Sequence, residues 1–209
     1  MLFNKSQTSL IKYPASKGGS YIIPNGVTNI GRSAFSAAST LTNVTIANSV
    51  SNIGEAAFGG CTSLISVTIP NRVTSLGGFL FAGCSGLTGL YFQGSAPRLD
   101  YEDWFGADKA TIYYLPGTSG WGMTFAERPT ALWRPRVETS GESFSVRTNQ
   151  FGFNITWASG MAVVVEASAS LADPIWFPVG TNSLTDGTTY FSDPQWTNYP
   201  ARLYRLRSQ

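Results

Sequence analysis

The sequence contains no histidine, and this absence excludes several kinds of active site. Histidine is the usual acid–base group near neutral pH and the commonest metal ligand in proteins. Without it the chain cannot build a Ser-His-Asp triad or a histidine zinc site, and two cysteines are too few for a cysteine-only zinc site. We therefore expect no metal and no other cofactor.

Charged residues are scarce as well and make up 12% of the chain, about half of the usual share. The net charge is only +2, and Lys and Arg are scattered, so we expect neither a nucleic-acid partner nor an anionic membrane. The polar surface must then come from Ser, Thr, Asn and Gly, a usage that is common in secreted bacterial proteins.

Long apolar segments are missing too. No run approaches the roughly 20 residues of a membrane-spanning helix, so we expect no membrane insertion. The first residues, MLFNKSQTSLIKYP, lack the basic start and the apolar stretch of a signal peptide. If the protein is extracellular or on the cell surface, we expect a natural parent with a signal peptide, and further repeats, upstream of this chain.

Familiar catalytic motifs are also absent, because the chain has no G-x-S-x-G, P-loop, H-E-x-x-H or C-x-x-C sequence. A retaining glycosidase needs two carboxyls about 5 Å apart, yet Glu55 is the only acidic residue within the repeats described below. Asp173 and Asp193 each precede a proline, which favours a structural role in a turn. The sequence therefore predicts a protein that is not an enzyme.

An acidic loop raises the question of a cation site. Its carboxylates lack the alternating D-x-D-x-D-G spacing of a calcium loop, so we predict no metal there. The residues are Asp100, Glu102, Asp103 and Asp108.

What the sequence does contain is a repeat of 23 residues that keeps its phase over about four units. Each unit can bury its apolar face only by stacking on its neighbours, so the repeat predicts a solenoid. The equivalent positions include Leu41, Leu64 and Leu87; Val44, Val67 and Leu90; Ile46, Ile69 and Phe92; Gly31, Gly54 and Gly77; and Phe35, Phe58 and Phe81.

One unit reads L-x-x-V-x-I-P-N-x-V-x-x-I-G-x-x-A-F-x-x-C. The opening LxxVxI predicts a short strand of a parallel sheet, and PN predicts a turn. The following VxxIG predicts a second extended piece, whose glycine would permit a tight corner. The AAFGGC segment predicts a helical or 3₁₀ turn that carries its Phe into the core.

This wording resembles leucine-rich repeats of the BspA-like type over residues 13–94. The resemblance implies a short leucine-rich-repeat solenoid and a non-catalytic role in protein binding or adhesion at a bacterial cell surface, with an unidentified protein ligand. The Asn of each unit falls one residue earlier than in the general leucine-rich template, so we carry over no asparagine ladder from that template. These residues are Asn25, Asn48 and Asn71.

Cys61 and Cys84 occupy equivalent positions in adjacent units, and a disulfide between the coils is one interpretation. Ala38 fills the same position one unit earlier, which favours a column of small buried residues. We therefore predict two buried free thiols.

The strand residues that point away from the core predict a partner-binding sheet face. They are mostly small and uncharged, and solenoids commonly bind partners on such faces. Good strand propensity on an exposed sheet is the alternative explanation for the threonines. The candidate residues are Ser20, Ile22, Asn43, Thr45, Ser66, Thr68 and Tyr91.

Both ends of the repeat array differ from the repeat itself. Residues 1–12 predict a small hairpin, and the first coil behind it would leave an open sheet edge through which the protein could self-associate. After Phe92 the register fails, and residues 95–133, with one strand in ATIYYLP, are predicted to cap the solenoid.

Residues 134–209 read as short alternating strands separated by Gly, Asn, Asp and Pro turns, which predicts a small antiparallel β-sandwich-like domain. They resemble β-rich modules on secreted repeat proteins of environmental bacteria. The overall fold class is therefore mainly β.

The aromatics of residues 134–209 suggest an alternative function, a carbohydrate-binding module. Trp176, Trp196 and Tyr199 are the candidates for stacking on a glycan, and Trp157, Tyr190 and Tyr204 could contribute. Filling the domain core is the competing explanation for these rings. A structural fibre or envelope component is a further alternative.

Overall fold

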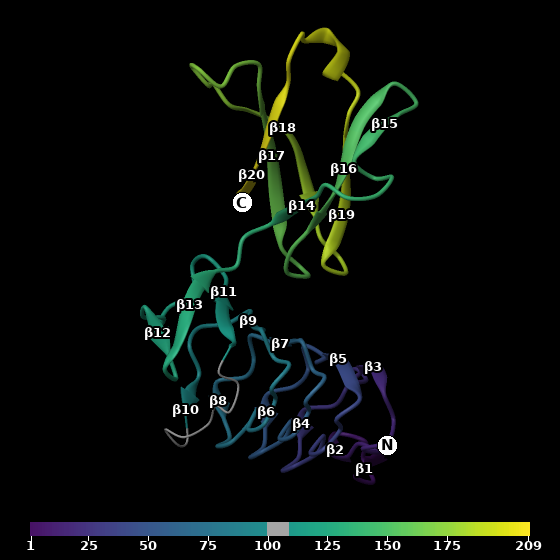
Figure 1. Ribbon diagram of the computed structural model, residues 1–209, viewed down its shortest axis with the longest axis vertical. Coiled ribbons are helices and arrows are strands. Elements are labelled where there is room, and N and C mark those ends of the chain that lie inside the picture. Colours follow the sequence, from purple (N-terminus) through teal and green to yellow (C-terminus); the bar gives the residue numbers. More distant parts are fainter. Residues whose placement is uncertain (100–108) are drawn as a thin grey trace. The chain divides into compact units, whose positions relative to one another are not determined.

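The computed structural model describes residues 1–99 and 109–209, which form two compact units, residues 1–133 and 134–209 (Figure 1). Regular structure in these residues is almost entirely β, apart from the 3₁₀ turn η1 (Trp196–Asn198). No helix of the described residues is long and apolar enough to cross a membrane. The acidic loop predicted to hold no metal, with Asp100, Glu102, Asp103 and Asp108, lies outside the described residues.

The first unit is a solenoid, as the repeat predicts, and one side of it is a parallel sheet in the order β13-β11-β9-β7-β5-β3, with β12 added antiparallel to β13. The register repeats from coil to coil, since Val44 lies beside Val67 and Val67 lies beside Leu90. The strands are β3 (Gly19–Ile22), β5 (Leu41–Thr45), β7 (Ser66–Ile69), β9 (Gly89–Phe92), β11 (Thr111–Tyr114), β12 (Thr124–Phe125) and β13 (Arg128–Leu132).

A second sheet, built mostly from two-residue strands, forms another side of the solenoid. It contains the extended pieces that VxxIG predicts, and the hairpin of β1 and β2 extends it because β2 also pairs in parallel with β4. The strands are β1 (Leu2–Phe3), β2 (Ser9–Lys12), β4 (Asn29–Ile30), β6 (Asn52–Ile53), β8 (Ser75–Leu76) and β10 (Arg98–Leu99).

The third side of each coil is a series of turns, so the predicted helical or 3₁₀ turn is wrong. Two residues per coil, such as Ala56 (φ 51°) and Gly60 (φ 73°), have left-handed backbone conformations that a right-handed helix does not accommodate. The backbone amides alternate between two kinds of partner: Phe58 N donates across coils to Leu80 O, whereas Cys61 N closes a local turn by donating to Phe58 O. The neighbouring coil therefore supplies some of the partners that a continuous helix would find within itself.

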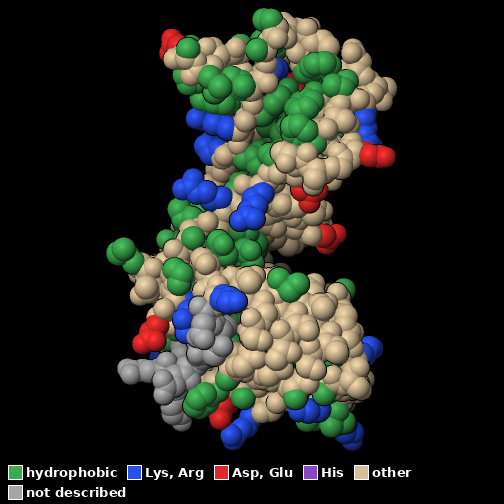
Figure 2. Space-filling model, viewed as in Figure 1, with side chains coloured by type: hydrophobic (Ala, Val, Ile, Leu, Met, Phe, Trp, Pro, Cys, Tyr) green, Lys and Arg blue, Asp and Glu red, His purple; other side chains and the backbone are tan. Residues whose placement is uncertain are grey.

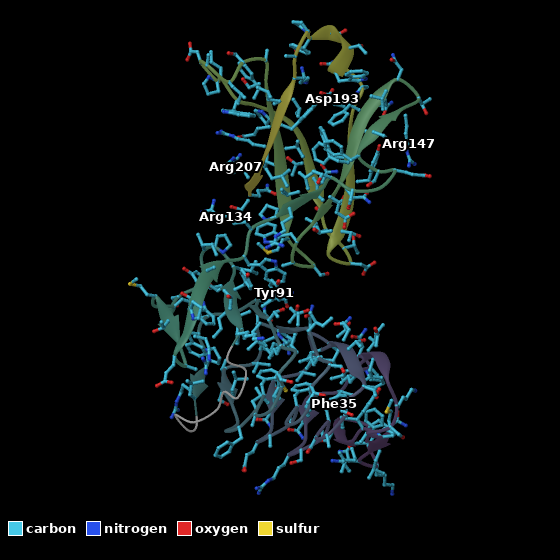
Figure 3. All side chains as sticks on the ribbon, in the orientation of Figure 1. Phe35, Tyr91, Arg134, Arg147, Asp193 and Arg207 are labelled. Carbon is cyan, nitrogen blue, oxygen red and sulfur yellow. The ribbon has the colours of Figure 1, made fainter. Side chains whose placement is uncertain are left out.

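The repeated phenylalanines stack in one file through the core, as the period predicts. Phe35 and Phe58 have ring centroids 4.9 Å apart and Phe58 and Phe81 5.4 Å apart, and all three rings are buried. Figure 3 labels Phe35 inside the first unit. Cys61 and Cys84 are buried free thiols, which confirms that prediction. Each thiol donates to a backbone carbonyl of the preceding coil, Cys61 to Phe35 O and Cys84 to Phe58 O.

The sequence suggests that the repeated glycine permits a tight corner of the chain, but the structure gives it another role. Gly77 does not have a positive φ, but a Cβ placed on it would lie 2.4 Å from the backbone nitrogen of Glu55 in the preceding coil. Two coils approach each other too closely at this point for any side chain. The glycine therefore serves close packing between coils.

Beyond the last repeat the parallel sheet continues although the 23-residue period stops. Strand β11 pairs with β9 and places Ile112 beside Leu90, and β13 pairs with β11 in turn. The rings of Trp121 and Phe125 pack on Phe92 at the end of the core. The described residues after the last repeat therefore continue the sheet and cover the end of the core.

The second unit contains two antiparallel sheets, as the sequence predicts. One has the order β14-β16-β15, with β19 also paired to β16, and the other has the order β18-β17-β20. Rings of β16 and β20 meet between them, since Phe151 stacks on Tyr204 at 5.4 Å and Phe153 meets it edge-on. The strands are β14 (Arg136–Glu138), β15 (Ser145–Arg147), β16 (Gln150–Thr156), β17 (Ala162–Ser168), β18 (Phe177–Ser183), β19 (Thr188–Asp193) and β20 (Leu203–Ser208).

Candidate functional site

The predicted partner-binding residues lie in two rows across the outer side of the longer sheet. Side chains alternate along each strand. Val44 and Val67 are buried, so the residues directly before and after each of them on its strand point outward, and the same holds in the other coils. The strand register places Ser20 beside Asn43 and Asn43 beside Ser66 in one row. The other row contains Ile22, Thr45, Thr68 and Tyr91 in order along the coils. We call these seven residues the outer sheet face.

The exposure of the outer sheet face falls from the first coil toward the last. Ile22 is 70% exposed, Thr45 is exposed, and Thr68 and Tyr91 are half-buried. The ring of Tyr91 lies along the sheet, because a Cβ on Gly89 would come within 2.9 Å of it. The face is therefore a shallow surface that becomes aromatic at one end.

Two aromatic residues that sequence reasoning missed extend this face. Tyr113 of β11 stacks on Tyr91 with ring centroids 4.8 Å apart and an interplanar angle of 11°. Trp133 approaches the other side of the group at 4.9 Å from Tyr91. The signal was the similarity of GLYF at β9 to TIYY at β11, 22 positions later, which a strict 23-residue period does not detect.

The outer sheet face carries no charged side chain. Its residues are Ser, Thr, Asn, Ile and Tyr, while the ion pair of the coils, Arg32 to Glu55 at 2.9 Å, lies among the turns. Figure 2 shows few charged side chains on the visible side of the first unit. A partner would meet hydrogen-bonding groups and rings here, with little electrostatic attraction.

The aromatics predicted to stack on a glycan do not come together as one platform. Trp196 and Tyr199 line a cavity of about 240 Å³ with Phe151, Arg202 and Tyr204, and hydrophobic side chains gather on this part of the second unit in Figure 2. Arg205 lies over the ring of Trp176 at 4.5 Å.

Trp176 and the 240 Å³ cavity lie on opposite faces of the sheet formed by β18, β17 and β20. Arg205 and Tyr204 are consecutive residues of β20, so their side chains point to opposite faces of that strand. Because Arg205 covers Trp176 while Tyr204 lines the cavity, the two tryptophans cannot serve one ligand there. Trp157 is 5% exposed and belongs to the core, so it offers no ring face to a ligand.

The polar groups around the 240 Å³ cavity bind one another. The guanidinium of Arg202 lies over the ring of Tyr199, and its Nε is 2.6 Å from Asp193 Oδ2 in an ion pair without hydrogen-bond geometry. Tyr204 donates to the same carboxylate at 2.9 Å, and burial together with this donation raises the pKa of Tyr204. Trp196 Nε1 donates to Asn149 O. Figure 3 shows the position of Asp193, which is buried.

Catalytic and metal-binding chemistry find little support in the described part of the chain. Within it, no group of three or more His, Cys, Asp or Glu side chains lies close enough to hold a metal ion. The most buried carboxylates, Glu166 and Asp193, are paired with arginines. Such pairing is typical of structural carboxylates.

The repeats match a known family. Residues 15–105 match the family model described as BspA type leucine rich repeat region, in 6 copies. No curated protein matches the chain.

Solved structures of bacterial proteins also match. A leucine-rich repeat protein from Eubacterium ventriosum is 29% identical with a TM-score of 0.48, over 54% of this chain and 31% of that one. A leucine rich cell surface protein from Faecalibacterium prausnitzii is 28% identical with a TM-score of 0.48, over 53% of this chain and 30% of that one. The pneumococcal vaccine antigen PcpA is 18% identical with a TM-score of 0.33, over 55% of this chain and 41% of that one. The matched part therefore spans less than half of each of these proteins.

Proposed function

Because residues 15–105 belong to the BspA-type leucine-rich repeats, we propose that this chain is a non-catalytic protein-binding or adhesion module of a secreted or cell-surface bacterial protein. The partner docks on the outer sheet face. The observation that carries the proposal is the pair of regular rows of that face, which end on the stacked rings of Tyr91 and Tyr113.

The rows suit a protein surface because they are rigid and regular. Parallel strands repeat every 4.8 Å or so, and five of them span about 20 Å, a width comparable to that of a small protein partner's contact patch. Small side chains such as Ser66 and Thr68 can hydrogen-bond with little loss of rotamer freedom. The affinity would therefore depend on shape and hydrogen bonding.

The aromatic rings at one end of the outer sheet face can supply the binding energy that its small residues lack. Tyrosine and tryptophan are the residues that most often dominate the binding energy of protein interfaces. Tyr91, Tyr113 and Trp133 already support one another, so little ordering is needed when a partner covers them. Ile22, at the opposite end of the same row, adds an exposed apolar contact.

Self-association is a second way in which this sheet could act. Strand β3 is the end of the longer sheet in the described part of the chain, so one edge of it has no partner strand there. An open edge of this kind can pair with a second copy. Sedimentation velocity over a hundredfold range of concentration tests this idea, and a constant monomer mass would reject it.

The docking proposal is tested by adding charge and bulk to the face. We expect Thr45→Arg with Thr68→Arg to weaken binding at least about tenfold, measured by biolayer interferometry against purified extracellular-matrix proteins that bind the wild type. The control, Ser51→Arg with Thr74→Arg, adds the same charge beside the short strands β6 and β8 and should leave binding unchanged. Equal affinity of both double variants would contradict the proposed face.

A further inference from the structure

The outer side of the four-stranded sheet in the second unit has a shallow hollow of about 620 Å³. Its side chains come from β15, β16, β19 and the turns next to them. Along β16 the residues Gln150, Gly152 and Asn154 point outward, because Phe153 and Ile155 are buried on the inner side. The lining residues are Ser143, Arg147, Thr148, Gln150, Asn154 and Tyr190.

One tyrosine ring leans across this sheet. Tyr190 stands opposite Asn154 in the register of β16 and β19 and is 45% exposed. Its ring leans over Gly152, where an added Cβ would lie 2.2 Å from the tyrosine hydroxyl and 2.6 Å from Cζ. The glycine therefore leaves room for the hydroxyl end of the ring next to the backbone, and the partly exposed ring borders the hollow.

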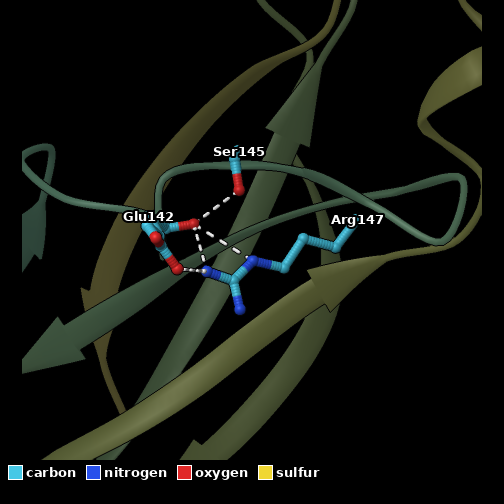
Figure 4. Close-up of polar contacts among 3 residues, drawn as sticks. All are labelled: Glu142, Ser145 and Arg147. Carbon is cyan, nitrogen blue, oxygen red and sulfur yellow. Dashed lines mark hydrogen bonds and ion pairs between the residues drawn. The ribbon is translucent and has the colours of Figure 1, made fainter.

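Hydrogen bonds fix the side of the hollow that contains Arg147. Arg147 Nε and Nη2 donate to the carbonyl of Glu142 at 3.1 and 2.7 Å, and Ser145 Oγ donates to the same oxygen at 2.6 Å (Figure 4). Thr148 and Asn149 both have positive φ, as in the tight hairpin turns that match the twist of paired strands. The wall is thus ordered before any ligand arrives.

Hydrogen-bonding groups surround the ring. Asn154 Nδ2 donates to Glu138 Oε2 at 3.2 Å, which orients the amide and leaves its oxygen toward the hollow as an acceptor. Within the described residues, the side chains of Thr148 and Gln150 make no hydrogen bond. The hollow therefore offers an apolar ring face bordered by amide and hydroxyl groups.

The hollow carries no excess of positive charge, because the contacts of the described residues place two carboxylates beside one arginine. Arg147 lies 3.3 Å from the carboxylate of Glu142, and Glu138 is the other charged group at the rim that the contacts reveal. A nucleotide or another anion would lack the excess of positive charge that such ligands need. The chemistry fits a neutral ligand with a flat apolar face and a ring of hydroxyls.

We propose that this hollow binds a neutral pyranose sugar, with the sugar ring stacked on Tyr190 and its hydroxyls bonded to Gln150, Asn154 and Arg147. Of the aromatics that the sequence suggests for a glycan platform, this site contains only Tyr190. Around the aromatic cavity of Trp196, the polar groups are already bonded to one another, whereas those of the Tyr190 hollow include free ones. The site does not depend on the outer sheet face and is tested separately from it.

The experiment uses the full chain on a printed array of neutral and acidic oligosaccharides, followed by isothermal titration calorimetry with the strongest neutral hit. We expect binding of neutral pyranose oligosaccharides, and we expect Tyr190→Ala to weaken it at least about tenfold. Tyr190→Phe keeps the ring and should stay within about threefold of the wild type, because stacking carries the contact. Circular dichroism confirms that each variant is folded.

Tyr199→Ala is the control, since it removes an aromatic ring from the other cavity and should leave the affinity unchanged. If Tyr190→Ala does not fold, Gln150→Ala and Asn154→Ala replace it, and each should weaken binding. Absence of any neutral hit would overturn the proposal, as would a preference for acidic glycans. Loss of binding in Tyr199→Ala but not in the hollow variants would overturn it as well.

Discussion

The rings of Phe35 and Phe58 lie nearly parallel, at 14° and with centroids 4.9 Å apart, although 23 positions separate them in the sequence. Paired parallel strands have almost the same spacing, about 4.8 Å. The stacked phenylalanine rings and the two sheets therefore advance by almost the same distance along the solenoid axis with each coil. This match lets one side chain per coil fill the core without a gap.

Removing the central ring should be the most damaging single change to the solenoid core. Phe58 touches a ring on each side and is fully buried, so Phe58→Ala would leave a cavity between Phe35 and Phe81. We expect a loss of about 3–5 kcal/mol in the free energy of unfolding, measured by urea denaturation followed by circular dichroism. Phe177→Ala, at a ring that is 62% exposed, should cost less than about 1 kcal/mol.

The close approach of neighbouring coils gives a second prediction. Gly77→Ala would place a methyl group 2.4 Å from Glu55 N, where only backbone could move aside. We expect a loss of at least about 2 kcal/mol in thermal or urea unfolding. Gly31→Ala is the control at the equivalent position of the first coil, where the nearest atom is 3.1 Å away, and it should cost clearly less. Equal losses would refute the packing explanation.

The repeat coils could be predicted because every column of the core recurs at one spacing. Val44, Val67 and Leu90 indicate the inward side of the long strands before any coordinates are known. Local dihedral angles were not predictable in the same way. The left-handed backbone at Ala56 has no residue signature, since alanine is a good helix former.

Positions beyond the repeat could not be predicted from the period. Strand β11 pairs with β9 after 22 positions, and the step to β13 is shorter, from Ile112 to Thr130. A fixed period therefore misses Tyr113 and Trp133. In the second unit, the buried residues Phe153 and Ile155 follow the alternation expected of a strand, but the pairing of β16 with β19 depends on long-range contacts. That pairing decides that Tyr190, and not Trp176, lies beside Asn154.

The two thiols should be inert in the folded protein. Both sulfurs are fully buried and each thiol donates to a backbone carbonyl, so a reagent cannot reach them or find a thiolate in the folded protein. We expect Ellman's reagent to label neither cysteine in native protein and both after denaturation. Ser39→Cys, at an exposed turn, provides a thiol that should react at once. Rapid native labelling of the unmodified chain would contradict the buried column.

Phe79 combines a bulky side chain, 47% exposed, with a left-handed backbone at φ 54°. Non-glycine residues pay about 1–2 kcal/mol in this region. We expect Phe79→Gly to be more stable than Phe79→Ala by about 1 kcal/mol in urea unfolding, because only glycine removes the strain. At ordinary helical or strand positions the alanine variant would be more stable than the glycine variant. If Phe79→Ala were the more stable variant here, backbone strain at Phe79 would be refuted.

The paired carboxylate of Glu166 should make folding stability depend on pH. Hydrogen bonds from Arg205 at 2.7 Å and Arg207 at 3.1 Å lower the pKa of Glu166. A carboxylate with a lowered folded-state pKa stabilises the fold above the unfolded pKa, about 4.3 for Glu, and loses this contribution as the pH falls through the folded-state value.

Glu166→Gln should therefore lower stability near pH 7 and make the unfolding free energy less steep in pH below about 5. Both arginines are about half exposed, so the effect is moderate. The measurement is urea unfolding of wild type and variant between pH 3 and 7. Glu142→Gln removes a carboxylate that is 96% exposed and should leave the acid slope as it is in the wild type. If Glu166→Gln kept the wild-type slope, the arginine pair would have no role in acid stability.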